Sequence, residues 1–286
     1  MLERHGHWVL TVIALGLFAP SLANGLTNWD DADYTVKSPF VTEGLKGAAD
    51  AFTVSYRGAY IPLTHAVLTV AGLANPANPL PYHLVQWLLF GVTVLLMPRA
   101  LAAFGLSRAV ALGATALWMV HPFRVESVSW IGNMKDAVSL ALVTGAFAAY
   151  GSNRRWLSAA AFLLGLLGKA SLVPLAPFFL VLEWKQTTPS RALVSSLRWL
   201  VPALVAGAYA VVVHRAFLPP QQAAIDPATP VYTPFWYLGR TLWPSHCRAV
   251  YEWVAPRGVT LALAIAGWVV LAALVSFGFR PRAGQG

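Results

Sequence analysis

Long apolar segments separated by short polar breaks are the feature that most constrains how this chain can fold. A membrane-spanning helix needs about 20 mostly apolar residues. With 57% hydrophobic and 11% charged residues, the 286-residue chain is too apolar for an ordinary soluble domain, in which about 25% of residues are charged. The sequence therefore predicts an all-α, polytopic transmembrane helical bundle of about eight spans, with further helices at the outer interface. The predicted spans are 8–24, 81–104, 107–120, 132–150, 156–168, 170–184, 195–217 and 258–278.

The whole chain, 1–286, is predicted to form a single membrane domain without a soluble C-terminal domain. Two polar stretches between spans, 25–80 and 218–257, are long enough to contain a site. A cleaved signal peptide is the alternative for the first apolar segment, because small residues near Ala23 can form a cleavage site. The single cysteine, Cys247, excludes an internal disulfide and a cysteine-based metal cluster.

The distribution of basic residues predicts the orientation in the membrane, because cytoplasmic loops are enriched in Lys and Arg. With the N-terminus inside, the inner segments carry ten basic residues and two acids, a net charge of +8. The outer segments carry ten basic residues and nine acids, a net charge of +1. Both termini are therefore expected in the cytoplasm and both long polar stretches outside. The overall charge of +9 is scattered between spans and forms no basic face, which argues against a nucleic-acid partner.

Two segments of the outer stretches are expected to lie at the membrane surface. AYIPLTHAVLTVAGL (59–73) is apolar on one face but contains Pro62, Thr64 and His65, which favours an interfacial helix. TPFWYLGRTLWPSHCRAVYEW (233–253) alternates aromatic with polar residues, as is typical at headgroup level. Together the two segments predict a roofed cavity on the outer side.

Chemistry-bearing residues gather on this predicted outer side. Lys135, Asp136 and Lys169 fall at or inside predicted spans, where a charge needs a partner or a polar cavity. Several candidates also have a structural interpretation: a solvated helix cap for the acids, a tight turn for HPFRVE, and packing for His65. For Lys135–Asp136 it is an adjacent charge pair that fixes helix depth, and for Lys169 it is snorkelling to the headgroups. The candidates are Asp30, Asp31, Asp33, His65, His121, Arg124, Glu126, Lys135, Asp136, Lys169, Arg240, His246 and Arg248.

No cofactor is established by the sequence. The outer acids can supply oxygen ligands to a divalent cation such as Mg²⁺ or Ca²⁺, but no ligand spacing stands out. The chain contains no recognised serine or cysteine nucleophile motif, no P-loop and no dinucleotide-binding fingerprint. Group transfer would therefore need a donor that is already activated.

In order along the chain, several strings resemble a known family. They are NWDDADYTVKSPFVTEGL (28–45), AFTVSYRGAYIPLTHAV (51–67), PYHLVQWLLFGV (81–92), HPFRVESVSWIGNMKDAVSL (121–140), LGLLGKASLVPLAPFFLVLEW (164–184) and YLGRTLWPSHCRAVYEW (237–253). They resemble the membrane domain of transmembrane and tetratricopeptide-repeat glycosyltransferases and their bacterial relatives. These proteins belong to the GT-C superfamily, which includes the protein O-mannosyltransferases.

The resemblance implies sugar transfer from a polyprenyl-phosphate-linked donor to an acceptor hydroxyl of a protein or glycan. It implies that Asp30 or Asp31, with Asp31 slightly favoured, is the general base, and that Lys169, Arg240 and Arg248 bind the donor phosphate. The remaining residues would line the cavity: Asp33, His65, His121, Arg124, Glu126, Lys135 and Asp136. It also implies a bacterial inner membrane location, with the site facing the periplasm and membrane lipids as surroundings.

The chain departs from the family pattern in three ways. Gln86 and the pair Phe90–Gly91 stand where relatives carry an Asn and a Leu-His pair, and Met134 replaces an arginine. The repeat domain is absent after the last span, which puts acceptor recognition in question. Two rival functions therefore stay open: a non-catalytic accessory subunit of a larger membrane complex, and a transporter or lipid flippase in which intramembrane charges mark a translocation path.

Overall fold

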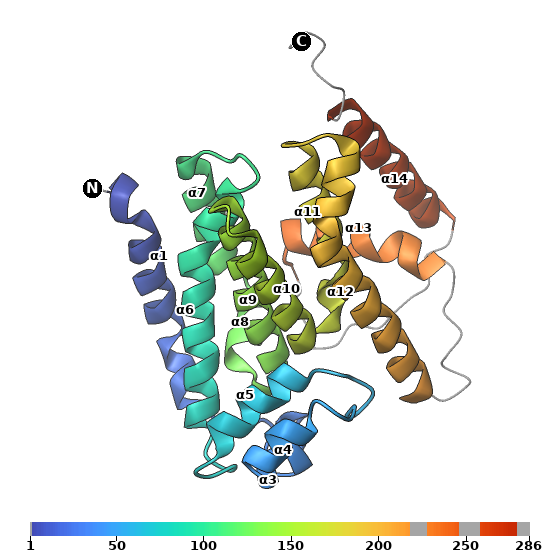
Figure 1. Ribbon diagram of the computed structural model, residues 1–286. Helices are drawn as coiled ribbons and strands as arrows, with labels where there is room; N and C mark the ends of the chain where they lie inside the picture. The colour runs from blue at the N-terminus through green and yellow to red at the C-terminus, as the bar shows by residue number, and fades with distance from the viewer. Residues whose placement is uncertain (1, 218–227, 246–257, 279–286) are drawn as a thin grey trace. The chain divides into compact units, whose positions relative to one another are not determined.

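The computed structural model describes residues 2–217, 228–245 and 258–278, and nearly all of the regular structure there is helical (Figure 1). In these ranges the only strand-like pairing is an isolated bridge between Tyr56 and Ala59. The prediction of an all-α chain is therefore confirmed for the described residues. The chain divides into two compact units, Met1–Leu218 and Pro219–Gly286.

The first unit contains most of the helices. Their bounds are α1 (Leu2–Phe18), the 3-10 helix η1 (Ala19–Ala23), α2 (Asp31–Tyr34), α3 (Pro39–Thr42), α4 (Leu45–Asp50), α5 (Pro62–Gly72), α6 (Leu80–Ala102), α7 (Arg108–Met119), α8 (Phe123–Ser129), η2 (Ile131–Asn133), α9 (Met134–Gly151), α10 (Arg155–Gly168), η3 (Ala170–Leu175), α11 (Ala176–Trp184) and α12 (Pro189–Phe217). The second unit contains α13 (Ala228–Leu242) and α14 (Val259–Gly278), which pack against each other.

All eight apolar ranges predicted as spans coincide with helices. Among the described residues, three helices are long and apolar enough to cross a membrane: His5–Ala23, Leu80–Ala102 and Pro189–Ala216. The apolar helices Arg108–Met119, Arg155–Gly168, Ala170–Trp184 and Thr260–Val270 are shorter. The chain is therefore described as a helical protein with three membrane-spanning candidates, and the eight-span bundle stays a prediction.

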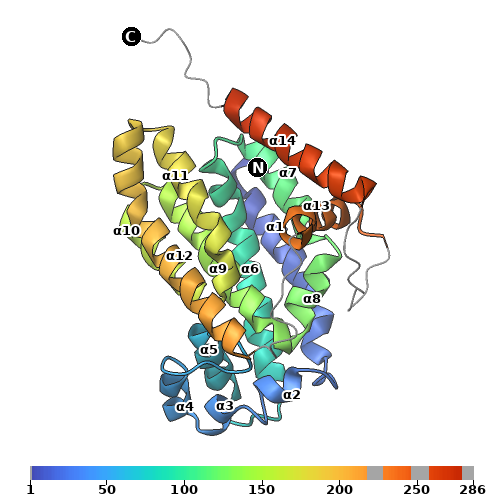
Figure 2. The ribbon, with the colours of Figure 1, turned by 90° about the vertical axis from the view of Figure 1, so that its right-hand side faces the viewer.

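Within the first unit, α6 packs against α1, α7 and α9, and α10 packs against α9 on the other side. Figures 1 and 2 show the short helices α2–α5 gathered at one end of these long helices, here called the cap end. The opposite end, called the loop end, is formed by the connections 103–107, 152–154 and 185–188. The two ends therefore differ in content, since one carries folded short helices and the other only tight loops.

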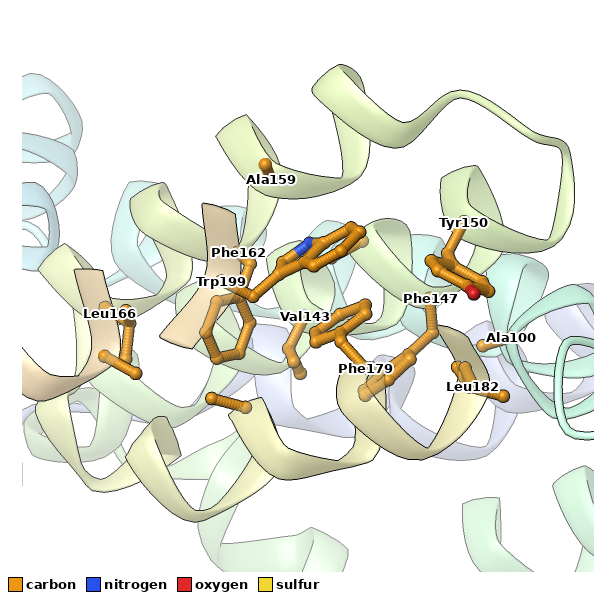
Figure 3. Close-up of a cluster of buried hydrophobic side chains, with 13 residues drawn as sticks. Ala100, Val143, Phe147, Tyr150, Ala159, Phe162, Leu166, Phe179, Leu182 and Trp199 are labelled. Carbon is orange, nitrogen blue, oxygen red and sulfur yellow. The ribbon is translucent and has the colours of Figure 1, made fainter. Parts of the chain in front are cut away.

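A stack of aromatic rings holds α9, α10, α11 and α12 together (Figure 3). The ring of Phe179 lies 4.6 Å from that of Trp199 at an interplanar angle of 3°, and 4.4 Å from that of Phe147 at 10°. Trp199 also donates a hydrogen bond from Nε1 to Ser158 Oγ at 3.2 Å. Because aromatic side chains bury large areas with a defined geometry, this stack fixes the helix positions that the site depends on.

A second apolar cluster lies under the cap end. It joins α3, α5, α6 and the beginning of α9, and consists of Val41, Leu68, Tyr82, Ile131, Met134 and Val138. Helix α5 begins at Pro62, whose fixed φ suits the first helical position. It is thus a packed part of the cap end, and the predicted range 59–73 contains it.

Candidate functional site

The carboxylate of Asp31 connects the segment between η1 and α2 to η2, the short 3-10 helix before α9. Its side chain is fully buried. Oδ2 accepts hydrogen bonds from the backbone N and the Oγ1 of Thr27, at 2.7 and 2.8 Å, and Oδ1 accepts one from the backbone N of Gly132 at 2.8 Å. Since both oxygens are engaged and buried, this carboxylate is suited to holding two segments together and poorly placed to take a proton from a substrate.

The neighbouring carboxylate, Asp30, has a different environment. Asp30 is half-buried and precedes α2, where its backbone oxygen accepts hydrogen bonds from Asp33 N and Tyr34 N at 3.0 and 3.2 Å. Among the described residues, nothing donates a hydrogen bond to its carboxylate or forms an ion pair with it. Its negative charge acts on Lys135 and on Tyr34. Asp30 therefore has the free acceptor capacity that a general base requires.

Lys169 forms an ion pair with Asp136. Lys169 follows the last residue of α10 in an extended conformation, and Asp136 lies in the first turn of α9. Gly168 allows the end of α10 to lie close to α9, because a Cβ at this position would come within 2.6 Å of Ser139 Oγ. Thr64 Oγ1 of α5 donates to the Gly168 carbonyl at 2.9 Å and so fixes the same turn. The predicted need of Lys169 for a partner is met by Asp136.

Lys135, in the first turn of α9, contacts both η2 and α2. Its Nζ donates to the Gly132 carbonyl at 3.0 Å and lies 5.3 Å from the centre of the Tyr34 ring. Its distance to the Trp130 ring is 5.9 Å, within the range of a cation–π interaction. The charges of Lys169, Asp136, Asp30 and Glu126 all act on it. Lys135 is therefore the centre of a cluster of five charged side chains from four segments.

Helix α8 closes one side of this cluster. Asn133 Nδ2 donates to Glu126 Oε1 at 3.3 Å, and the Arg124 guanidinium lies 4.9 Å from the Trp118 ring. Burial lowers the pKa of Arg124 from its ordinary value, while Asp136 and Glu126 act in the opposite direction. Gln86 of α6 fixes α8 by donating from Nε2 to the carbonyls of residues 127 and 130, at 3.1 and 2.7 Å.

His121 lies two residues before the first residue of α8. Its Nδ1 accepts a hydrogen bond from Phe123 N at 3.3 Å. It lines a hollow of about 300 Å³ between the end of α1 and α8, together with Phe18, Ser21 and Val125. None of the charged residues Asp30, Glu126, Lys135, Asp136 and Lys169 lines this hollow, so the place of His121 in a cavity shared with them stays a prediction.

His65 is buried in an aromatic cage. Its ring lies 4.6 Å from Phe40, 5.6 Å from Tyr56 and 5.9 Å from Tyr34. Both ring nitrogens lack a hydrogen-bond partner among the described residues. Burial lowers the pKa of His65 to about 4, and the positive charge of Lys135 contributes to the same shift. His65 is thus a neutral packing residue in the wall behind the cluster.

Asp33 is held away from the lysines. Its Oδ2 pairs with Arg57 Nη1 at 3.2 Å, and Tyr56 OH donates to its backbone oxygen at 3.2 Å. These contacts fold the loop before α5 back onto α2. Burial raises the pKa of the adjacent Tyr34, and the charge of Asp30 adds to that effect.

The predicted helpers of the donor phosphate lie in the second unit. Arg240 of α13 donates from Nη1 to the Ser245 carbonyl at 2.9 Å, and its guanidinium lies 5.4 Å from the Trp236 ring. His246 and Arg248 lie outside the described residues. In the described part of the chain no group of three or more His, Cys, Asp or Glu side chains is arranged to hold a metal ion.

Comparison with protein-family models, with curated proteins and with solved structures finds no match. The chemistry of the site therefore follows from its own residues. Sequence reasoning gave no site role to Thr27 and Thr64, whose hydrogen bonds position Asp31 and the turn at Lys169. It also gave no site role to Trp130, whose indole Nε1 is buried without a partner among the described residues. The one local signal that could have indicated it is that Trp130 lies only four residues before Met134, where the helix that carries Lys135 and Asp136 begins.

Proposed function

We propose that this chain is an integral-membrane glycosyltransferase that moves a sugar from a polyprenyl-phosphate-linked donor to an acceptor hydroxyl. One observation carries the proposal. The unengaged carboxylate of Asp30 and the ammonium groups of Lys135 and Lys169 belong to one electrostatic cluster at the cap end of a bundle of apolar helices. An acid and two cations at that position match a reaction that removes a proton and releases a phosphate.

In the proposed reaction, Asp30 accepts the proton of the acceptor hydroxyl while that oxygen forms a bond to the anomeric carbon of the sugar. The bond between the anomeric carbon and the phosphate oxygen breaks, and the electron pair stays on the polyprenyl phosphate. Lys135 and Lys169 stabilise the charge that develops on that phosphate. Asp31 contributes by holding the loop that carries Asp30, and Arg240 and Arg248 stay predicted helpers.

The proposed orientation puts the cap end outside and the loop end in the cytoplasm. The basic residues Arg99, Arg108 and Arg154 at the loop end support it, because cytoplasmic loops are enriched in such residues. In a bacterial inner membrane both termini would then be cytoplasmic. The acceptor, a protein or glycan hydroxyl, would approach from the periplasm.

A second candidate is a non-catalytic accessory subunit of a larger membrane complex. The ion pair between Lys169 and Asp136 favours it, because a donor phosphate would have to compete with a carboxylate already bound to that ammonium group. In this alternative the charged residues fasten α9 to α10 and to α2. The two candidates differ in whether the isolated chain turns over a lipid-linked sugar.

The deciding experiment compares two matched aspartate variants in proteoliposomes supplied with radiolabelled polyprenyl-phosphate hexoses. Asp30→Asn should lower transfer about 100- to 10,000-fold, the usual contribution of a general base, without changing the temperature of unfolding. Asp33→Asn, which affects only the contact with Arg57, should retain most of the activity. Full activity of Asp30→Asn would refute Asp30 as the base. Absence of turnover by the wild-type chain, together with its co-purification in a larger complex, would favour the accessory subunit.

A further inference from the structure

The loop end carries basic side chains that have almost no acidic counterparts. Between residues 137 and 199 the only acidic residue is Glu183. The basic residues in the same range, apart from Lys169 at the cap end, are Arg154, Arg155, Lys185, Arg191 and Arg198. This end of α10 and α12 is therefore strongly positive, whichever way the helices are oriented in a membrane.

Glu183 is already neutralised by Arg155. Arg155 Nε lies 3.0 Å from Glu183 Oε1, and its Nη groups donate to the Tyr150 carbonyl and to Gln186 Oε1 at 2.6 and 2.8 Å. The guanidinium also lies 3.8 Å from the centre of the Tyr150 ring. Arg155 and Glu183 therefore join α9, α10 and α11, and Arg155 has no positive charge left to attract another anion. Among the described residues, Arg154, Lys185, Arg191 and Arg198 form no ion pair.

Arg198 is held in place by aromatic rings at the contact of α10 with α12. Its guanidinium lies 4.9 Å from the ring of Trp156 and 5.3 Å from that of Trp199, and its Nε donates to the Ser195 carbonyl at 2.8 Å. These contacts use the Nε and the face of the guanidinium. The terminal nitrogens, which suit bidentate contact with a phosphate, have no hydrogen bond within the described part of the chain.

The surface next to Arg198 is aromatic and apolar. Trp156 is 76% exposed although it follows directly after two arginines, and an exposed indole is typical of headgroup level in a bilayer. Further from the loop end, Val201 and Val205 on the face of α12 that carries Arg198 are exposed and apolar, as is Leu157 of α10. The guanidinium of Arg198 suits the phosphate of a phospholipid headgroup, and the adjacent apolar surface suits its acyl chains.

We infer that the loop end between α10 and α12 binds an anionic phospholipid. Arg198 and Arg154 contact the headgroup phosphate, Trp156 lies at headgroup level, and the acyl chains cover the exposed apolar side chains. Charge complementarity selects the anionic class, because four basic residues at this end form no ion pair among the described residues and attract a headgroup with net negative charge. The lipid site is separate from the cap end and does not depend on the proposed sugar transfer.

The test is a lipid titration of the purified, delipidated full chain, followed by native mass spectrometry. Phosphatidylglycerol is compared with phosphatidylcholine of the same acyl chains. The double variant Arg154→Gln, Arg198→Gln should bind phosphatidylglycerol roughly 30-fold more weakly, since each basic residue near an anionic surface strengthens binding about fivefold. Binding of phosphatidylcholine should not change.

The matched control removes the same charge from another part of the loop end. Arg99 and Arg108 lie at the ends of α6 and α7, and Arg99→Gln with Arg108→Gln should leave the affinity nearly unchanged. An equal loss in both double variants, or equal affinity of the wild type for both lipids, would overturn the inference. Displacement of the lipid by millimolar inorganic phosphate would also overturn it, by showing a simple anion site. If Arg154→Gln, Arg198→Gln fails to fold, exposed Arg154→Gln alone should weaken binding about fivefold.

Discussion

Acidification should destabilise this protein through His65. The folded chain holds the imidazole in a cage of Phe40, Tyr34 and Tyr56, with Lys135 as the charged group acting on it. Burial and the nearby ammonium group both disfavour a protonated ring, so the folded-state pKa is about 4, against 6.5 for an unperturbed histidine. The unfolded chain therefore binds a proton at a pH where the folded chain does not.

The direction and size of the effect follow from proton linkage. The folded-state pKa is lowered, so the stabilising contribution is fully present above pH 6.5 and is lost as the pH falls from 6.5 towards 4. At pH 5 the unfolded state gains about 2 kcal/mol, and the limit below pH 4 is roughly 3 kcal/mol. For a chain of this size, about 2 kcal/mol corresponds to a fall of roughly 4–8 °C in Tm.

The assay is thermal unfolding in detergent micelles, followed by intrinsic tryptophan fluorescence at pH 7.5, 6 and 5. His65→Phe keeps an aromatic ring in the cage and removes the titrating group, so its Tm should fall roughly 4–8 °C less than that of the wild type between pH 7.5 and 5. His5→Gln, at an exposed position of α1, should behave like the wild type. Equal acid sensitivity of wild type and His65→Phe would refute the reasoning.

Two substitutions test the contacts that hold the helices in place. Asp31→Ala should lower the free energy of unfolding by roughly 3 kcal/mol, because the buried amide of Gly132 loses its acceptor. Asp31→Asn keeps the side-chain volume and one acceptor oxygen, so it should lower the free energy of unfolding by less. An equal loss in the two variants would contradict this account. Glu183→Gln should also cost roughly 3 kcal/mol, since Glu183 is the buried member of the pair and the partly buried Arg155 would lose its counter-charge. Glu43→Gln is the control, because Glu43 pairs with Lys46 at an exposed position, and it should change Tm little. A fall in Tm equal to that of Glu183→Gln would refute the importance of burial.

The helices were predictable because hydropathy is a local property. The predicted span 81–104 corresponds to α6 (Leu80–Ala102), and 156–168 to α10 (Arg155–Gly168). Helix α12 begins at Pro189, six residues before the predicted start at 195, because hydropathy detects where apolar residues begin whereas proline favours the first helical position. The range 170–184 forms a 3-10 helix followed by an α-helix, since Pro174 and Pro177 interrupt it.

The contacts within the site were not predictable, because they join residues far apart in the sequence. That Lys169 and Asp136 need partners follows from their place among apolar residues, but not that they pair with each other. Nor does the sequence distinguish Asp30 from Asp31, which are adjacent and identical in type. Only the turn at α2 decides that one carboxylate meets Gly132 while the other is left unengaged.

The hydrogen bonds from Gly132 to Asp31 and from Thr64 to Gly168 span 101 and 104 residues. A chain emerging from the ribosome therefore contains Asp31 and Thr64 long before their hydrogen-bond partners have been synthesised. Closing such long loops is entropically costly and requires that the helices between them have already been synthesised. The charged cluster is thus incomplete until Lys169 has been synthesised, and a nascent chain released before residue 169 contains Asp136 without the lysine that pairs with it.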